Sequence, residues 1–381
     1  MNKTVYLDYS ATTPQAPEVT EAISRWNREV FGNPSSQHSF GRAAKARIEE
    51  ARDHLADHTG FLPKEIAFTS GGTESNNWAL VGTVRAHRNK TMHIIVSAVE
   101  HPSLLKTAEY LQTVGYEVSY AQPTADGVVT AEEIARLIKK NTVLVSVMHV
   151  NNETGVINPV EEIGRLCRER GILFHCDAVQ SFGKTGLKLN ETGAGLITLS
   201  AHKIYGPKGC GALIIREGTA LEPLLHGGGQ EAGRRPGTEN INGIIGFDAA
   251  LALLNAEKDY STVKKLQHYF ERELSERFPF CRINGAAAAR SPFISNVSFP
   301  GVDNESLLIN LDLSGIAVSV GSACSSGSVR PSHVLQAMGL PAGLVNSTVR
   351  FSFGRHTTRD QLEYTLEKLK EILPRLRKKR S

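Results

Sequence analysis

The chain has 381 residues, of which 40% are hydrophobic and 22% charged, with 34 glycines and 16 prolines. This composition is typical of a globular enzyme of two or three domains and excludes collagen, a coiled coil and a wholly disordered chain. The net charge is +4 at pH 7, but five of the last seven residues are basic, so residues 1–374 carry +4 less 5, or −1. We therefore expect no direct binding to nucleic acid, which needs a basic face on the fold itself.

The sequence also bears on location and on metal binding. No hydrophobic run approaches the roughly 20 apolar residues of a membrane helix, and Asp8 interrupts the N-terminus before a signal-peptide core could form. We therefore expect a cytoplasmic protein without membrane association. The five cysteines are odd in number and form no C-x-x-C pair, which argues against a disulfide framework and a metal site. We interpret the basic tail as a solvated helix end; the alternative is a docking tail for an acidic partner.

Strand and helix patterns alternate along the first two thirds of the chain. A strand at residues 5–7 and a helix near 17–30 come first. The alternation from about residue 65 to residue 216 is typical of an α/β fold with a largely parallel sheet flanked by helices. The expected strands are residues 65–69, 93–97, 117–120, 142–150, 172–175, 196–199 and 211–215. The helices between them include one with a capping box at residues 130–133 and one at 160–170 closed by a glycine.

A long amphipathic stretch over residues 246–278 breaks this alternation and is expected to form the bridge into a second domain. Beyond it we expect strands at 293–299, 316–320 and 348–353 and helices at 304–311, 332–338 and 358–376. The predicted division is a large domain of residues 15–255 and a small domain formed by residues 1–14 and 256–381.

A glycine-rich junction between a strand and a helix, FTSGGTESNN at residues 68–77, is the first candidate site. Free N–H groups at a helix N-terminus and the helix dipole favour an anion, and glycines let a phosphate approach the backbone. The alternative is an ordinary turn, because any strand-to-helix junction favours Gly and Thr. The Walker pattern is absent, and the glycines at 206–209 and 227–229 do not form a dinucleotide fingerprint.

Two charged residues follow later strands of the predicted sheet. Asp177 ends one apolar run, and Lys203 follows the next, 26 residues further on. Taken singly, Asp177 could belong to a structural ion pair, and Lys203 could be a surface lysine. A phosphate cradle, a carboxylate for a pyridinium nitrogen and an amine for a Schiff base are together what pyridoxal 5'-phosphate requires. Lys203 would then need a lowered pKa, which a partly desolvated cationic cleft provides.

Cys324 differs from the other cysteines because it lies in a stretch of small residues, GSACSSGS at 321–328. No apolar neighbour is available there to bury the thiol, so we expect an exposed, mobile loop. Cys167 and Cys176 lie in an amphipathic helix and an apolar strand, and are expected to be buried.

Eight motifs resemble, in order, those of cysteine desulfurases of the NifS/IscS type in the class V aminotransferase family. They are YLDYSATTP (6–14), GNPSS (32–36), TESNN (73–77), EH (100–101), HVNNETG (149–155), DAVQS (177–181), SAHK (200–203) and GSAC (321–324). The resemblance covers essentially the whole chain. It implies a fold-type I architecture, with a mostly parallel seven-stranded sheet in the large domain, a smaller α+β C-terminal domain, and a homodimer.

The resemblance also assigns roles around the ring of pyridoxal 5'-phosphate. Lys203 would form the Schiff base and take the substrate's Cα proton, while Asp177 would pair with the pyridinium nitrogen. Gln180 would contact the ring hydroxyl, and Asn152 would lie beside the ring and the substrate. His101 would stack on the ring and assist proton transfer; a packed strand-end histidine is the alternative.

Further positions match the family's phosphate and substrate contacts. Arg350 would clamp the substrate carboxylate, with a surface cation on an edge strand as the alternative. Thr238 would reach the phosphate of the neighbouring subunit, with a turn residue as the alternative. The residues expected to hold the chain's own phosphate are Gly72, Thr73, Ser200 and His202.

The implied reaction converts L-cysteine to L-alanine and leaves a persulfide on Cys324 for a sulfur-acceptor protein. That acceptor would be an iron–sulfur cluster scaffold or a thiolation enzyme. Arg330 places a cation where many relatives have an acid, which leaves the choice of acceptor open. The alternatives are another class V aminotransferase, a selenocysteine lyase, and a sulfur-relay scaffold without turnover.

Overall fold

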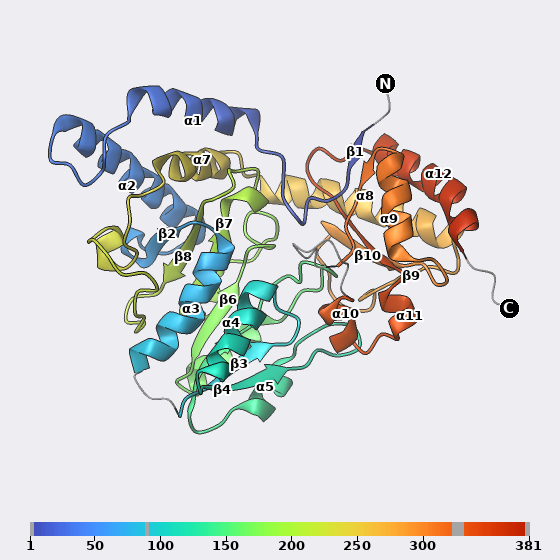
Figure 1. Ribbon diagram of the computed structural model, residues 1–381, viewed down its shortest axis with the longest axis horizontal. Coiled ribbons are helices and arrows are strands. Elements are labelled where there is room, and N and C mark those ends of the chain that lie inside the picture. Colours follow the sequence, from blue (N-terminus) through green and yellow to red (C-terminus); the bar gives the residue numbers. More distant parts are fainter. Residues whose placement is uncertain (1–3, 88–90, 322–330, 378–381) are drawn as a thin grey trace.

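The computed structural model describes residues 4–87, 91–321 and 331–377. Figure 1 shows two parts side by side: a larger one built around a central sheet, and a smaller one that contains most of the C-terminal third of the chain. The N-terminal strand lies beside the C-terminal elements of the smaller part, and the chain then passes into the larger part.

The larger part contains the predicted seven-stranded sheet, in the order β2-β8-β7-β6-β5-β3-β4. Strands β3 to β7 pair in parallel, whereas β8 is antiparallel to both of its neighbours, so the sheet is mostly parallel as expected. The strands are β2 (Ile66–Thr69), β3 (His93–Ser97), β4 (Glu117–Ala121), β5 (Thr142–Ser146), β6 (Leu173–Asp177), β7 (Leu196–Ser200) and β8 (Gly211–Ile215).

Two of these strands end two or more residues away from the predicted position. β5 ends at Ser146 rather than at residue 150, because the N–H of Met148 is donated at 2.6 Å to the Glu100 carboxylate and not to a neighbouring strand. β6 continues to Asp177, so this carboxylate is the last residue of the strand itself. Both differences bring polar side chains to the C-terminal edge of the sheet, where open α/β sheets bind ligands.

Helices cover both faces of the sheet. One core joins the face bearing Ile95 and Ile197 to α2, α5, α6 and α7, and the other joins the face bearing Ile94 and Val96 to α3 and α4. The helices are α1 (Pro17–Glu29), α2 (Ser39–Thr59), α3 (Gly72–His87), α4 (Pro102–Thr113), α5 (Ala131–Leu137), α6 (Val160–Glu169) and α7 (Ile241–Ala252).

Helix ends match the sequence signals in part. Gly171, with φ +65°, follows α6 as expected. Thr130 caps α5 by accepting the Glu133 N–H at 3.3 Å, but the predicted reciprocal bond is missing. The Glu133 side chain accepts the N–H of Gln122 and pairs with Arg136 instead.

The amphipathic stretch over residues 246–278 contains the end of α7 and all of α8 (Ala256–Arg277). The two helices are separate because the side chain of Asn255 accepts the Lys258 N–H at 3.2 Å and starts a new helix. Asn competes with helical hydrogen bonding by such local contacts, which favours it at caps.

The smaller part has its own core around the sheet β12-β10-β9 and helices α8, α9 and α12. Val5 and Leu7 of the N-terminal segment are buried in it, and β1 (Val5–Tyr6) pairs in parallel with β11 (Ile316–Ala317). The other elements are β9 (Arg282–Ile283), β10 (Ile294–Ser298), α9 (Asn304–Leu313), α10 (His333–Ala337), α11 (Ala342–Val345), β12 (Thr348–Ser352) and α12 (Arg359–Leu376).

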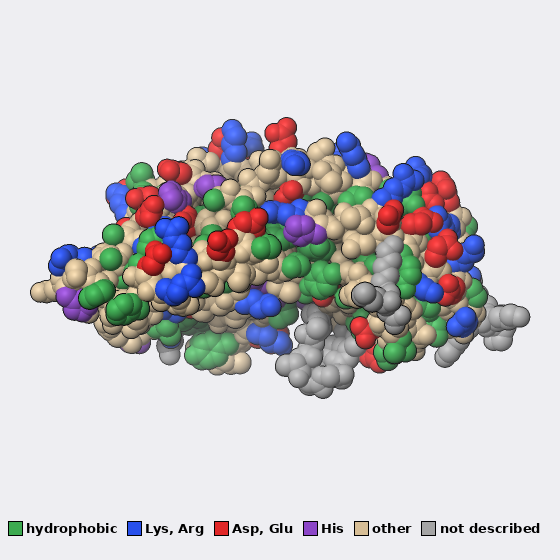
Figure 2. All heavy atoms as spheres, turned by 90° about the horizontal axis from the view of Figure 1, so that it is seen from above, with side chains coloured by type: hydrophobic (Ala, Val, Ile, Leu, Met, Phe, Trp, Pro, Cys, Tyr) green, Lys and Arg blue, Asp and Glu red, His purple; other side chains and the backbone are tan. Residues whose placement is uncertain are grey.

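The division at residues 15 and 255 stays a prediction, supported by these separate cores. One segment of the predicted small domain packs elsewhere, since Val334 and Leu335 of α10 join the core of the larger part. Acidic and basic side chains are interspersed on the face in Figure 2. Within residues 4–87, 91–321 and 331–377, no helix has the length and hydropathy to cross a membrane, and no three His, Cys, Asp or Glu side chains form a metal-binding group.

Candidate active site

A cavity of about 460 Å³ lies between the C-terminal edge of the sheet and the smaller part of the chain. The N-terminal segment, the starts of α3 and α4, the loop after β5, the ends of β6 and β7, and β12 all contribute to its wall. Almost every described residue that the sequence nominated lines it: Gly72, Thr73, His101, Asn152, Asp177, Gln180, Ser200, His202, Lys203 and Arg350.

Two nominated residues are not among them. Thr238 is exposed and does not line the cavity. Cys324 lies outside the described residues, as do Arg330 and the last four residues of the basic tail. Gly321, three residues before Cys324, does line the cavity.

Asp177 is buried and has no cationic partner within the described part of the chain. Its carboxylate accepts the Val179 N–H at 2.9 Å and the Asn76 side-chain amide at 2.8 Å. A buried carboxylate ordinarily requires a paired positive charge. The ion-pair alternative therefore receives no support, and the site fits a ligand that brings its own cation, such as a pyridinium nitrogen.

Lys203 is half-buried, so the surface-lysine alternative is wrong. It follows β7 in a short 3-10 helix, Ala201–Lys203, and its Nζ donates to the carbonyl oxygens of Ser10 at 2.6 Å and Ala11 at 2.7 Å. Burial and, next, the Arg350 guanidinium lower the pKa of Lys203 to about 8. About a tenth of the amine is therefore uncharged at pH 7, far more than for an ordinary lysine, and the uncharged form is the one that a nucleophile or base requires.

The start of α3 has the properties of a phosphate cradle. Gly71 has φ +145°, a conformation that favours glycine, and a Cβ on Gly72 would lie 3.1 Å from the Val179 side chain. The Ser200 hydroxyl lines the cavity and is buried without a hydrogen-bond partner in the described chain. Such an orphaned donor fits an anion at the helix N-terminus. His202 contacts the Thr12 hydroxyl at 3.1 Å, and burial and nearby lysines lower its pKa to about 3.

His101 both lines the cavity and caps α4. Its Nδ1 accepts the Ser103 N–H at 3.1 Å, so the neutral ring carries its hydrogen on Nε2. Burial lowers the pKa of His101, which keeps the ring neutral at physiological pH. His101 therefore both packs at the start of α4 and lines the cavity, so the two interpretations of this residue do not exclude each other.

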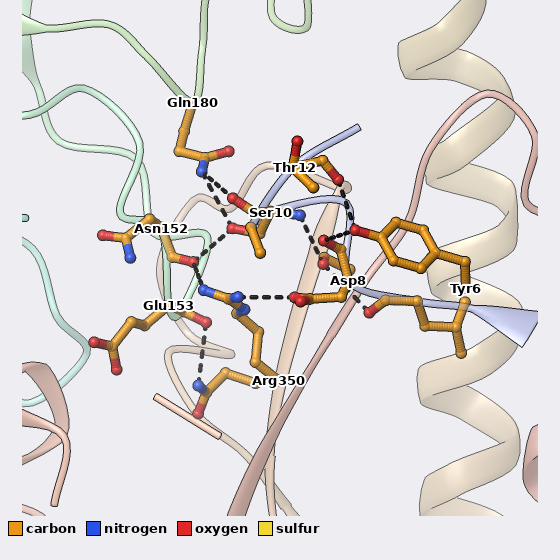
Figure 3. Close-up of polar contacts among 12 residues, drawn as sticks. Tyr6, Asp8, Ser10, Thr12, Asn152, Glu153, Gln180 and Arg350 are labelled. Atoms are coloured by element: carbon orange, nitrogen blue, oxygen red, sulfur yellow. Dashed lines mark hydrogen bonds and ion pairs between the residues drawn. The ribbon is translucent and has the colours of Figure 1, made fainter. Parts of the chain in front are cut away.

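Arg350 is buried in β12, so it is not a surface cation. One end of its guanidinium donates to the backbone oxygen of Asn152 and the other to Asp8 Oδ1, both at 2.9 Å (Figure 3). Its Nε is buried without a partner in the described chain. The Ser10 hydroxyl donates to the same Asn152 oxygen at 2.8 Å. Figure 3 shows Gln180 directed at Ser10 from the side away from Arg350.

Sequence reasoning gave no role to Asp8, Ser10 and Asn76. All three lie in motifs that carried the family resemblance, which was the available signal. Their contacts to Arg350, Gln180 and Asp177 join segments up to 342 residues apart in the chain, and periodicity cannot reveal such contacts.

The four described cysteines are poor nucleophiles. Cys167 and Cys176 are buried as predicted, and so is Cys210. Burial raises the pKa of Cys167 and Cys210 to about 12, that of Cys281 to about 11, and that of Cys176 well above its usual range. Thiolate chemistry by these residues is therefore disfavoured at neutral pH.

Known proteins similar to this chain agree with the geometry. The aminotransferase class-V family model matches residues 5–365. The cysteine desulfurase IscS of Dictyoglomus turgidum is 46% identical over 379 residues, covering 99% of this chain and 96% of that protein. A solved NifS-like protein has a TM-score of 0.92 and 36% identity, covering 98% of this chain and 100% of its own. The structure described as SspA in complex with cysteine has a TM-score of 0.83 and 35% identity, covering 93% and 100%.

Proposed function

The chain belongs to the class V aminotransferase family, and on that premise we propose how its residues act as a pyridoxal-phosphate-dependent cysteine desulfurase. One observation carries the assignment of roles. Asp177, buried without a cation, and Lys203, with a pKa of about 8, face the same cavity as the buried Arg350. The reaction releases L-alanine from L-cysteine and retains the sulfur.

The cavity residues fit pyridoxal phosphate by charge and donor type. Asp177 would hold the ring nitrogen protonated, Gln180 would donate to the ring hydroxyl oxygen, and Lys203 would attach the cofactor. The start of α3, with Ser200 and His202, would hold the phosphate. When bound, the cofactor supplies an electron sink for the bonds at the substrate's Cα and Cβ.

Proton transfer and substrate binding are assigned to three side chains. Lys203 Nζ, uncharged in part near neutral pH, accepts the Cα proton of cysteine. His101 presents Nε2–H and can carry a proton within the cavity. Arg350 binds the substrate carboxylate, and Asp8 and the Asn152 carbonyl hold its fork in place.

Cys324 is proposed as the sulfur acceptor within the enzyme. Gly321 lines the cavity, and three extended residues span roughly 10 Å, so the Cys324 thiolate can reach a bound substrate. The thiolate attacks the substrate sulfur, a sulfur–sulfur bond forms, and the Cβ–S bond breaks. The Cβ then gains a proton, and a proton is returned to the Cα, which gives alanine. The persulfide passes its outer sulfur to an acceptor protein, proposed to be a cluster scaffold or a thiolation enzyme in the cytoplasm.

Alanine formation from L-cysteine, with a reductant present, tests this assignment. The wild type should form alanine over many turnovers, and Cys324→Ala should form almost none. Cys281→Ala is the matched control, because that half-buried thiol lies outside the cavity. Full alanine production by Cys324→Ala would contradict the persulfide route.

We also propose a homodimer in which Thr238 reaches the partner's phosphate. The loop that carries Thr238 is held to the body by the Arg52–Glu231 and Arg235–Glu74 ion pairs and leaves Thr238 exposed. The aromatic rings of Phe31 and Phe40 stack 5.0 Å apart while largely exposed, which suits a covered interface. Sedimentation equilibrium tests the dimer, and a monomer at micromolar concentration would contradict it.

A further inference from the structure

Lys184 is a buried cation that the function described above does not use. Its residue is only 7% exposed, and no carboxylate within the described chain lies within ion-pair distance of its Nζ. The nitrogen lies 5.9 Å from the centre of the Phe293 ring. Burial, followed by the charges of Lys203 and Arg350, lowers the pKa of Lys184 to about 7. An unpaired buried ammonium destabilises the fold, so its presence calls for a functional reason.

Among the described residues, the Lys184 ammonium forms one hydrogen bond, to the Gln180 side chain. Nζ lies 3.2 Å from Gln180 Oε1, and the two residues are four positions apart on one turn. The other end of that amide, Nε2, donates to the Ser10 carbonyl oxygen at 2.9 Å and lies 3.2 Å from the Ser10 hydroxyl.

These contacts determine which way the amide faces. An ammonium can only donate and a carbonyl oxygen can only accept, so Oε1 must face Lys184 and Nε2 must face Ser10. The flipped amide would set two donors against each other at one end and two acceptors at the other. Without Lys184, only the Ser10 contacts would hold the amide.

Lys184 also lies behind Gln180 as seen from the active site. Gln180 lines the cavity of about 460 Å³, and Lys184 does not. Lys184 instead lines a separate void of about 10 Å³, which it shares with Phe293 and Lys203. Because Lys203 lines both spaces, any effect of Lys184 on a ligand in the main cavity must pass through Gln180, through Lys203 or through its charge.

We propose that Lys184 is a positioning residue that fixes the Gln180 amide with Oε1 toward Lys184 and Nε2 toward Ser10, which lines the active-site cavity. The proposal rests on the proposed function, in which Gln180 donates to the ring hydroxyl oxygen of pyridoxal phosphate. An N–H facing that oxygen stabilises its negatively charged form, whereas a carbonyl oxygen would repel it.

The test is the pH midpoint at which the absorbance of bound pyridoxal phosphate changes in the substrate-free holoenzyme. Lys184→Met keeps the length of the side chain and removes both the donor and the charge. We expect the midpoint to rise by about one pH unit, a tenfold change in proton affinity, because the deprotonated form loses its donor. Lys188→Met is the matched control, since Lys188 is exposed in an ion pair with Glu191, and it should not move the midpoint.

A double-mutant cycle separates positioning from charge. The charged groups around this part of the site include Lys203, Arg350, Asp8 and Asp177. Loss of one more cation could therefore raise the midpoint by itself. If Lys184 acts through Gln180, Lys184→Met should change the midpoint by less than about a third as much in a Gln180→Leu background. An equal shift in both backgrounds, or no shift in either, would overturn the proposal.

Lys184→Gln is a second variant that guards against a folding defect, because it retains a donor but no charge. Its midpoint should stay near that of the wild type, and a midpoint equal to that of Lys184→Met would overturn the proposal. Failure of the proposed function is distinguishable: wild-type protein would then bind no pyridoxal phosphate in a Lys203-dependent manner, whatever the state of Lys184.

Discussion

The active-site cavity and the Arg52–Glu231 anchor of the Thr238 loop differ in whether their buried charges are paired within the chain. In the anchor, Arg52 and Glu231 form a bidentate pair at 2.7 and 2.8 Å, and the Phe68 N–H and the Ile66 carbonyl oxygen satisfy the remaining sites. In the cavity, Asp177 lacks a cation, and the Ser200 hydroxyl has no partner within the described chain.

Pairing within the chain therefore distinguishes buried charges that stabilise the fold from buried charges that are available to a ligand. Buried groups that find all their partners within the chain leave nothing to bind, and removing one partner leaves an uncompensated charge. Groups left unsatisfied by the chain gain their partners from the molecule that binds. Three substitutions or conditions test this contrast.

The largest effect is expected for Lys203→Ala. Alanine formation should fall by at least about 1,000-fold, since the substitution removes a general base as well as the cofactor attachment. The free energy of unfolding should change by less than about 1 kcal/mol, because Nζ bonds only to two backbone oxygens. Enzyme kinetics and urea unfolding measure the two quantities. If unfolding of the Lys203→Ala variant explained its loss of activity, Lys203 would be a residue that holds the fold together, and the contrast would be wrong.

A smaller effect, and one of the opposite kind, is expected for Glu231→Gln. Loss of one partner of the buried pair should lower the free energy of unfolding by about 3 kcal/mol, measured by urea denaturation. Glu49→Gln is the matched control, because Glu49 contacts the same Arg52 with a side chain 49% exposed. It should cost less than about 0.5 kcal/mol. Equal losses in the two variants would show that burial of the pair is unimportant.

The smallest effect concerns pH. The pKa of Lys184 is about 7 in the folded protein and near 10.5 when unfolded, so between these values the unfolded state binds more protons. Stability from this group therefore rises with pH, and the cost of its charge is fully present below pH 7. Relative to Lys184→Met, we expect the wild type to gain about 1 kcal/mol between pH 7 and 8, measured by urea unfolding of the holoenzyme. A constant difference between the two proteins would show that Lys184 does not lose its proton in this range.

The sequence by itself determined the fold class, the seven strands of the central sheet and ten of the residues that line the cavity. Alternation of apolar runs with helical patterns depends on local periodicity, which the chain displays directly. The eight ordered motifs, which include those at Asp177 and Lys203, identified the family before any contact was known.

Tertiary structure alone decided where elements stop and which charges meet. β5 ends early because Glu100, 48 residues away, takes the Met148 N–H. The Asp8–Arg350 pair and the burial of Lys184 behind Gln180 depend on segments distant in the chain. Long-range pairing and desolvation follow from packing in three dimensions, so residue types and spacing do not encode them in readable form.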